Sequence, residues 1–346
     1  MHDQKFTMSV PLKITPVLLV RLFLLGITIP VLLGIFTYVG FFTNYTCCVF
    51  SQAGFEQQYL ESSIYRFRIL GSHSLLWTYQ QIKDWPLADF APYALKVLDK
   101  NGDPNFYYAY FLMNTFFLCL TCIALVFALS RYAAKNDFMH IDLPILCLAL
   151  LMSFAQFVIT PYDTLSYFFL AAATLPIMKI TPSLLDDIFL GIIVILAALT
   201  RETATLILSF YLAVHHKSIL GNSFLNSKKI RLLIMTTLFL ATYWALRWYL
   251  GMGDATHKSF RLLLNFSNDP LPIIGALFFP AVISLFFTDG NARKTLAIFL
   301  AASTPYWLAM LCVAYPWEIR LWVPIILLMV FLKLCPTHHS QEKIAI

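Results

Sequence analysis

The chain has 346 residues, of which 60% are hydrophobic and 12% are charged, about half the charged fraction of an ordinary soluble domain. A soluble protein of this length could not keep so much apolar surface away from water, so a lipid bilayer is the simplest solvent for it. The glycine-rich patterns GxGxxG and GxxxxGK[ST] do not occur, and the net charge of +6 is spread over membrane flanks, so neither a nucleotide-binding fold nor a nucleic-acid partner is expected.

Long apolar runs predict one all-α membrane domain, residues 1–346. The first span is Arg21–Phe42, and a long polar stretch, Thr43–Phe106, follows it. The later apolar runs are Tyr107–Ser130, Leu143–Thr160, Thr164–Met178, Ile188–Val214, Leu232–Leu250, Leu271–Phe287, Thr295–Tyr315 and Leu321–Leu332. With Ile188–Val214 interpreted as two half-length spans, the pattern predicts about ten membrane-crossing segments.

The run Ile188–Val214 has an alternative interpretation, because Arg201 and Glu202 interrupt it. A single helix would bury both charges in the middle of the bilayer, at a cost of about 2.5–3.5 kcal/mol each before pairing. Two short spans that meet at Arg201 and Glu202 avoid this cost if they border a water-filled cavity. We favour the two short spans and keep the single helix as the alternative.

The basic residues predict the orientation in the membrane, with both termini and the tail 336–346 in the cytoplasm. On this topology fourteen basic residues face the cytoplasm, namely Lys5, Lys13, Arg21, Arg131, Lys135, Lys179, Lys217, Lys228, Lys229, Arg231, Arg293, Lys294, Lys333 and Lys343. Apart from the long loop 43–106, the outer side receives five, namely Arg201, Arg247, Lys258, Arg261 and Arg320. Within the outer loop, Ser62–Gln80 mixes apolar and basic residues in a way that is typical of a helix on the membrane surface.

Charged residues recur at the outer ends of the predicted spans, in four parts of the chain that are far apart in sequence. They are Glu56, Glu61, Arg66 and Arg68 in the outer loop, Asp163, the pair Arg201 and Glu202, and the pair Glu318 and Arg320. Charge at a membrane boundary is costly unless it is paired or used. Arginine binds phosphate through two hydrogen bonds, and a carboxylate in a pocket of low dielectric constant can act as a general base. If these residues converge, they predict a half-buried site that accepts a lipid-linked phosphate.

Each group also has a purely structural interpretation. Arg201 and Glu202 could fasten two half-helices together, and Asp163 could cap the helix that begins at Thr164. Glu318 and Arg320 could form an ordinary interfacial pair. Two further groups remain, with the same ambiguity: Arg66 and Arg68 could contact lipid headgroups only, and Glu56 and Glu61 could be solvated loop charges.

The arrangement resembles the GT-C class of membrane glycosyltransferases, multi-span enzymes that use polyprenyl-phosphate-linked sugars. The patterns that carry the resemblance are Tyr65-Arg66-Phe67-Arg68-Ile69-Leu70, Pro161-Tyr162-Asp163-Thr164, Leu199-Thr200-Arg201-Glu202-Thr203 and Glu318-Ile319-Arg320. The chain departs from the class in its first loop, which lacks an acidic pair soon after the first span. The nearest acidic residue, Glu56, lies about fourteen positions beyond Phe42.

The resemblance implies transfer of a sugar in the assembly of envelope polysaccharide or glycolipid at a bacterial inner membrane, with roles for the outer charges. Glu56 or Glu61 would be the catalytic base, and Asp163 would orient the acceptor or help to hold a divalent metal, a requirement that the sequence leaves open. The arginines would bind the donor: Arg201 and Arg320, held by Glu202 and Glu318, at its phosphate, and Arg66 and Arg68 at the lipid headgroup.

Other functions remain open on the sequence. A polysaccharide polymerase or ligase also uses outer-face arginines on a multi-span body. A transporter or flippase is favoured by the two short segments around Arg201 and Glu202, which resemble discontinuous transporter helices, although the two halves of the chain show no visible symmetry. A non-enzymatic assembly subunit is a third class. Membrane lipids are expected partners in every case.

Overall fold

The computed structural model describes residues 15–40, 50–61, 64–87, 95, 99, 101–133, 136–179, 181–221, 226–251, 270–288 and 290–335. Within these ranges the chain forms helices, turns and connecting segments, and no strand. The all-α prediction is therefore confirmed for the described part of the chain.

The N-terminal half contains one long helix in which α-helical and π-helical turns alternate, a short helical segment of α3 and η3, and three further helices, α4, α6 and α7. The elements are α1 Pro16–Phe23, η1 Leu24–Thr28, α2 Ile29–Ile35, η2 Phe36–Gly40, α3 Gln52–Phe55, η3 Glu56–Glu61, η4 Ile64–Phe67, α4 Ile69–Ile82, α6 Pro104–Tyr132, η6 Phe138–Asp142, α7 Leu143–Phe154 and η7 Ala155–Phe157. Thr15 caps the first helix, since its hydroxyl accepts a hydrogen bond from the amide of Leu18 at 3.2 Å. Two π-helical segments, η1 and η2, lie inside this first span.

The C-terminal half contains shorter helices. The elements are α8 Asp163–Ile177, α9 Leu184–Thr200, η8 Glu202–Ala204, α10 Thr205–Leu220, α11 Ser227–Leu250, α13 Pro270–Ser284, η9 Leu285–Thr288, α14 Gly290–Ala302, α15 Thr304–Val313 and α16 Ile319–Leu334. Each apolar run found in the sequence corresponds to one or two of the helices. The run Ile188–Val214 is divided at Arg201, whose extended backbone (φ −167°, ψ 156°) separates α9 from α10.

Four helical stretches in the described residues are long and apolar enough to cross a membrane. They are Pro16–Gly40, Pro104–Tyr132, Phe138–Phe157 and Ser227–Leu250. A fifth candidate is the pair Ala292–Ala302 and Thr304–Cys312, which is bent by 52° at Ser303. Helices such as α8 are apolar but only 15 residues long. The structure thus supports an integral membrane protein with four to five clear spans, and the larger number counted from the sequence depends on helices of this shorter kind.

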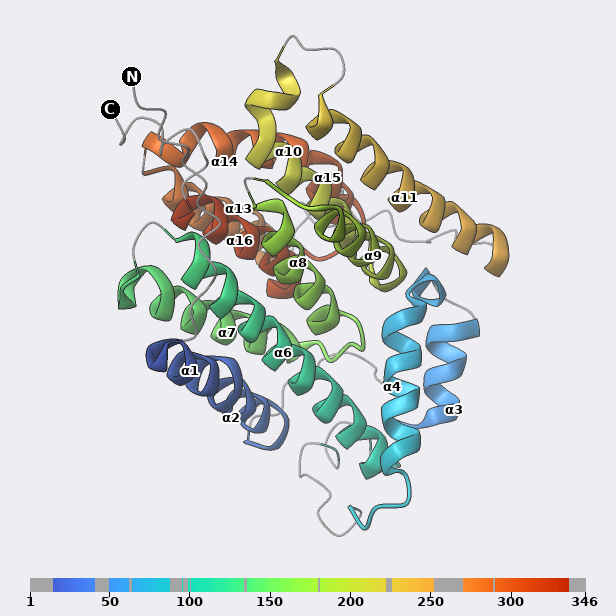
Figure 1. The fold of residues 1–346 in the computed structure, drawn as a ribbon. Helices are drawn as coiled ribbons and strands as arrows, with labels where there is room; N and C mark the ends of the chain where they lie inside the picture. The colour runs from blue at the N-terminus through green and yellow to red at the C-terminus, as the bar shows by residue number, and fades with distance from the viewer. Residues whose placement is uncertain are drawn as a thin grey trace, which may run out of the picture.

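Helix α8 lies in the middle of the molecule and packs against α6, α9 and α16 (Figure 1). Thirteen of its 15 residues are buried, whereas only Met235, Phe239 and Leu246 are buried among the 24 residues of α11. Large apolar side chains are exposed along the first span and α11, including Phe23 and Leu233. Exposed apolar surface on this scale is expected where lipid, not water, is the solvent.

A second, aromatic core lies beside the main one, where α3 and α4 stand next to the end of α6 (Figure 1). Most of its members come from the predicted outer loop and from the start of α6, and they include Phe50, Phe55, Phe106 and Tyr110; Tyr162, just before α8, also belongs to it. Phe55 stacks on Tyr59 with ring centroids 4.8 Å apart. This aromatic core fixes the loop helices α3 and α4 to the N-terminal end of α6.

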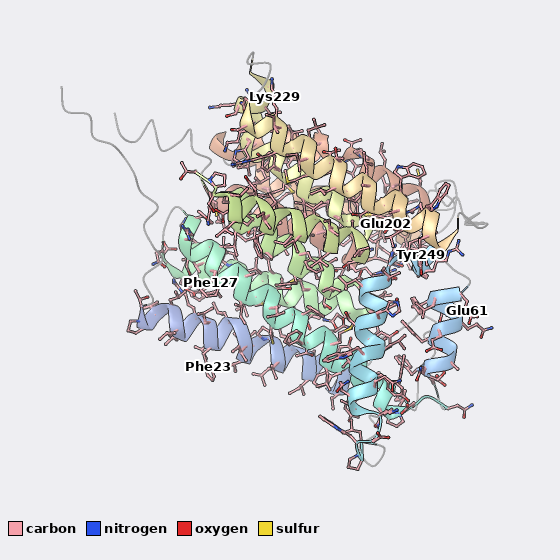
Figure 2. All side chains as sticks on the ribbon, turned by 45° about the vertical axis from the view of Figure 1, so that its right-hand side comes forward. Phe23, Glu61, Phe127, Glu202, Lys229 and Tyr249 are labelled. Atoms are coloured by element: carbon pink, nitrogen blue, oxygen red, sulfur yellow. The ribbon has the colours of Figure 1, made fainter. Side chains whose placement is uncertain are left out.

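The helices have two charged ends. We call one the basic end, where α1, α8 and α11 have Arg21, Lys179 and Arg231 at or near their termini, and the other the network end, where α8, α9 and α16 have Asp163, Arg201 and Arg320. Figure 2 shows Lys229 and Tyr249 at opposite ends of α11, with Glu202 on the side of Tyr249. Because consecutive helices run up and down, residues far apart in sequence meet at each end.

Candidate functional site

Asp163 is the centre of the network end. It lies in the first turn of α8, where the N-cap position is taken by Tyr162, so the capping role considered from the sequence is not the one that the structure shows. Its carboxylate instead forms ion pairs with two arginines: Oδ1 with Arg201 Nη1, and Oδ2 with Arg320 Nη1 at 3.5 Å. The side chains of Asp163 and Arg201 are only 5% and 6% exposed.

Glu318 supplies the second carboxylate of this group. Its Oε2 accepts a hydrogen bond from Arg320 Nε at 2.7 Å, just before α16 begins. The backbone of this corner is held in place by Tyr167 and Tyr306, whose hydroxyls donate to the carbonyls of Arg320 (3.1 Å) and Leu321 (2.9 Å). Arg320 is therefore fixed both through its side chain and through its main chain.

Arg68 and Glu202 form the third pair, between the predicted outer loop and the break after α9. Arg68 Nη2 lies 3.0 Å from Glu202 Oε2. Burial by itself would lower the pKa of the Arg68 guanidinium, but the Glu202 carboxylate, together with the smaller contributions of Tyr162, Tyr65 and Asp163, outweighs burial and raises that pKa above its usual value, so Arg68 stays charged. The Glu202 side chain is 43% exposed, the most accessible carboxylate in the network.

Tyr162 joins this pair to the rest of the network. The Arg68 guanidinium carbon lies 4.4 Å from the centre of the Tyr162 ring, and that of Arg201 lies 5.7 Å from it. Both distances are typical of cation–π contacts. Sequence reasoning assigned Tyr162 no role, although it lies inside the Pro161-Tyr162-Asp163 pattern. The one sequence feature that could have indicated its role is that this aromatic residue directly precedes the charged residue Asp163.

Six of the nine candidate residues thus form one connected group, which we call the arginine–carboxylate network: Arg68, Asp163, Arg201, Glu202, Glu318 and Arg320. Three guanidinium groups and three carboxylates give it no net charge. Taking charges out of water is costly, and such a network is tolerated because every charge has a partner. The convergence expected for these residues is present in the fold.

Three candidates lie outside the network. Glu56 accepts a hydrogen bond from Gln52 Nε2 at 2.7 Å, and Glu61 is exposed. Neither makes an ion pair with the network within the described ranges. The segment that carries them is linked to the network through aromatic rings: Tyr59 contacts Tyr65 at 5.2 Å, and Tyr65 stacks on Tyr162 at 6.0 Å.

Arg66, the last of the three, points elsewhere. Its Nη2 donates to the carbonyl of Gly251 at 2.6 Å, beyond the end of α11. The side chains of Arg66 and Arg68 therefore separate, although the sequence grouped them at one headgroup.

The described residues contain no group of three histidine, cysteine or acidic side chains that is placed to hold a metal ion. The expected contribution of Asp163 to a divalent metal does not fit its surroundings, because each of its oxygens faces a guanidinium group. Two positive charges at that carboxylate would repel a divalent cation.

Close backbone packing sets the position of α4 against the segment Pro161–Asp163. Gly71 in α4 lies against Pro161 and Tyr162, and a Cβ at Gly71 would come within 2.6 Å of the Pro161 carbonyl oxygen. Glycine at this point lets the loop helix approach the segment that carries Tyr162 and Asp163.

Comparison of the sequence with protein-family models and with curated proteins, and of the fold with solved structures, found no match.

Proposed function

We propose that this chain is a membrane glycosyltransferase that moves a sugar from a polyprenyl-phosphate donor to a hydroxyl acceptor. The reaction takes place at the outer face of a bacterial inner membrane, in the assembly of cell-envelope polysaccharide or glycolipid. The proposal includes about ten membrane-crossing segments, cytoplasmic termini and the outer position of residues 43–106.

The observation that supports this proposal is the pairing of Arg68 with Glu202 at the accessible edge of a buried ionic network. Glu202 offers an exposed carboxylate that its ion pair with Arg68 keeps deprotonated. Arg68 Nε is buried and has no hydrogen-bond partner in the described structure. An unused donor of this kind is costly without a ligand, and a phosphate oxygen would satisfy it.

In the proposed reaction Glu202 accepts the proton of the acceptor hydroxyl. The acceptor oxygen then forms a bond to the anomeric carbon of the sugar, and the bond from that carbon to the phosphate oxygen breaks. The phosphate leaves with the electron pair, and Arg68 stabilises its charge. The other four network residues hold Arg68 and Glu202 in place through Tyr162 and through the chain at Arg201.

Glu56 and Glu61 remain further candidates for the base, as the sequence suggested. They lie on η3, and the aromatic contacts of Tyr59 and Tyr65 connect that segment to Tyr162. Their position outside the network leaves their carboxylates without a fixed guanidinium partner, so Glu202 is the better supported choice.

Transfer from a panel of radiolabelled polyprenyl-phosphate sugars to a membrane-lipid extract, with the purified protein, tests the proposal. Glu202→Gln is expected to slow transfer about 100-fold to 10,000-fold, because the proton acceptor is lost. Asp187→Asn, a matched change at the basic end, is expected to leave transfer intact. Failure of the unaltered protein to consume any donor, or full activity of the Glu202, Glu56 and Glu61 amide variants alike, would overturn the proposal.

A flippase or other transporter is the second candidate, favoured by the break between α9 and α10. Two helices of 17 and 16 residues meet at an extended residue, as discontinuous transporter helices do. A cysteine placed at position 202 separates the two functions. Labelling from the outer side by an impermeant reagent supports the enzyme, and protection from both sides supports the transporter.

A further inference from the structure

Two arginines share one aromatic ring next to the network, outside the residues that the proposed reaction uses. The guanidinium carbons of Arg66 and Arg247 lie 4.9 Å and 4.6 Å from the centre of the Phe67 ring. Arg247 also lies 3.4 Å from the centre of the Tyr243 ring, one turn earlier in α11. The outer loop and the end of α11 thus each bring one positive charge to the same aromatic ring, that of Phe67.

These two arginines differ from the arginines of the network in their partners. Arg68, Arg201 and Arg320 each have a carboxylate, whereas neither Arg66 nor Arg247 forms an ion pair with any described residue. Arg66 has a backbone carbonyl as its partner, that of Gly251. Two neighbouring guanidinium groups repel each other unless an anion lies between them. The pair therefore has the charge pattern of an anion site.

The surface that leads to this pair is apolar and ends in exposed aromatic residues. Along α11, Leu233, Ile234, Leu240, Trp244 and Trp248 are exposed at helical spacing, and Trp248 is 86% exposed. Trp244, Ala245, Arg247 and Trp248 line a hollow on this helix. Tryptophan at the end of an apolar stripe marks the level of the lipid headgroups.

We propose that Arg66 and Arg247 bind the phosphate of an anionic glycerophospholipid, whose acyl chains lie along the apolar stripe of α11. The two guanidinium groups supply paired donors to the phosphate oxygens, and Trp244 and Trp248 flank the headgroup. Two guanidinium groups favour a lipid with a net negative charge over a zwitterionic lipid, whose ammonium group they would repel. The bound lipid holds the outer loop against α11 and so stands beside Arg68.

Native mass spectrometry of the full chain in detergent tests this, with phosphatidylglycerol and phosphatidylcholine as probes. The unaltered protein is expected to prefer phosphatidylglycerol, and Arg66→Gln/Arg247→Gln is expected to lower that affinity about thirtyfold, at roughly fivefold to sixfold for each charge. The matched control is Arg293→Gln/Lys294→Gln in α14, where both side chains are exposed. Thermal unfolding verifies that both variants fold.

Three results would overturn the lipid site: equal binding of the two lipids by the unaltered protein, equal loss of phosphatidylglycerol in the control, or displacement of phosphatidylglycerol by an equimolar amount of polyprenyl phosphate. The last result would assign the two arginines to the donor instead. Loss of lipid preference in the Arg66 and Arg247 variant with transfer activity retained would support the lipid site and leave the proposed function standing.

Discussion

The two ends of the helices both carry ion pairs, but they differ in how those pairs are built. At the basic end each pair stands alone: Arg231 Nη2 lies 3.1 Å from Asp187, with side chains 23% and 34% exposed. At the network end one carboxylate, that of Asp163, serves two arginines and is almost fully buried. Isolated pairs of the first kind can follow from membrane topology alone, because basic residues tend to collect on one side of a membrane. The second requires a specific fold around it.

The contrast shows why pairing by itself says little about function. Exposed pairs contribute about 0–1 kcal/mol and can be exchanged at little cost. A buried network is costly to assemble and costly to damage, so its presence beside an accessible carboxylate calls for a reason other than stability. The proton transfer that we propose for Glu202 would be such a reason.

Removal of the shared carboxylate should have the largest effect on stability. Asp163→Asn leaves Arg201 buried without its counter-charge, and we expect the free energy of unfolding to fall by about 3–5 kcal/mol. Denaturant titration of the protein in detergent measures this change. Asp187→Asn, the matched change at the basic end, should cost less than about 1 kcal/mol. Equal losses in the two variants would show that the two ends do not differ as described.

A change in the packing of the network should have a smaller effect. Gly71→Ala places a methyl group 2.6 Å from the Pro161 carbonyl oxygen, which must move together with the neighbouring Tyr162. We expect a loss of about 1–3 kcal/mol in unfolding free energy. Gly191→Ala is the control, because its nearest neighbour, in Leu238, would lie at 3.4 Å. A cost at Gly191 as large as that at Gly71 would remove close approach as the explanation.

The half-buried pair of Arg231 and Asp187 should show the smallest effect and the clearest dependence on salt. We expect Arg231→Gln to change the unfolding free energy by less than about 1 kcal/mol and the change to vanish in concentrated salt, since exposed charges are screened. Thermal unfolding at low and high ionic strength provides the measurement. A salt-independent loss at Arg231 would mean that its pair with Asp187 behaves like the buried network.

Particular residues show how far the sequence predicted the site. The expectation that Asp163, Arg201 and Arg320 meet could be made because each stands at the end of an apolar run, and run ends on one side of a membrane lie at one level. Their exact partners could not be predicted, because the choice between phosphate and carboxylate partners for Arg201 depends on side-chain direction. Arg66 and Arg68 were grouped because they are two positions apart, yet the turn at η4 sends one towards Gly251 and the other towards Glu202.

His215 and His216 precede a lysine and a serine in the sequence, yet the structure buries both histidines. His215 Nε2 lies 3.1 Å from the carbonyl oxygen of Ile177, and its Nδ1 lies 3.2 Å from Lys228 Nζ. Their neighbours in sequence are polar, so the pattern indicated exposure, but α10 continues beyond the apolar run and packs against the end of α8. Tertiary contact overrode the local composition here.

The sequence by itself determined that the described chain is helical and apolar enough for a membrane, because hydrophobicity and helix length are properties of consecutive residues. It also determined that charge collects at run ends, since the bilayer excludes charge elsewhere. Only the tertiary structure decided that Asp163 is shared by two arginines, that Tyr162 lies between Arg68 and Arg201, and that neither Arg66 nor Arg247 forms an ion pair with a described residue. Those facts depend on how helices distant in sequence pack, and no local pattern encodes that packing.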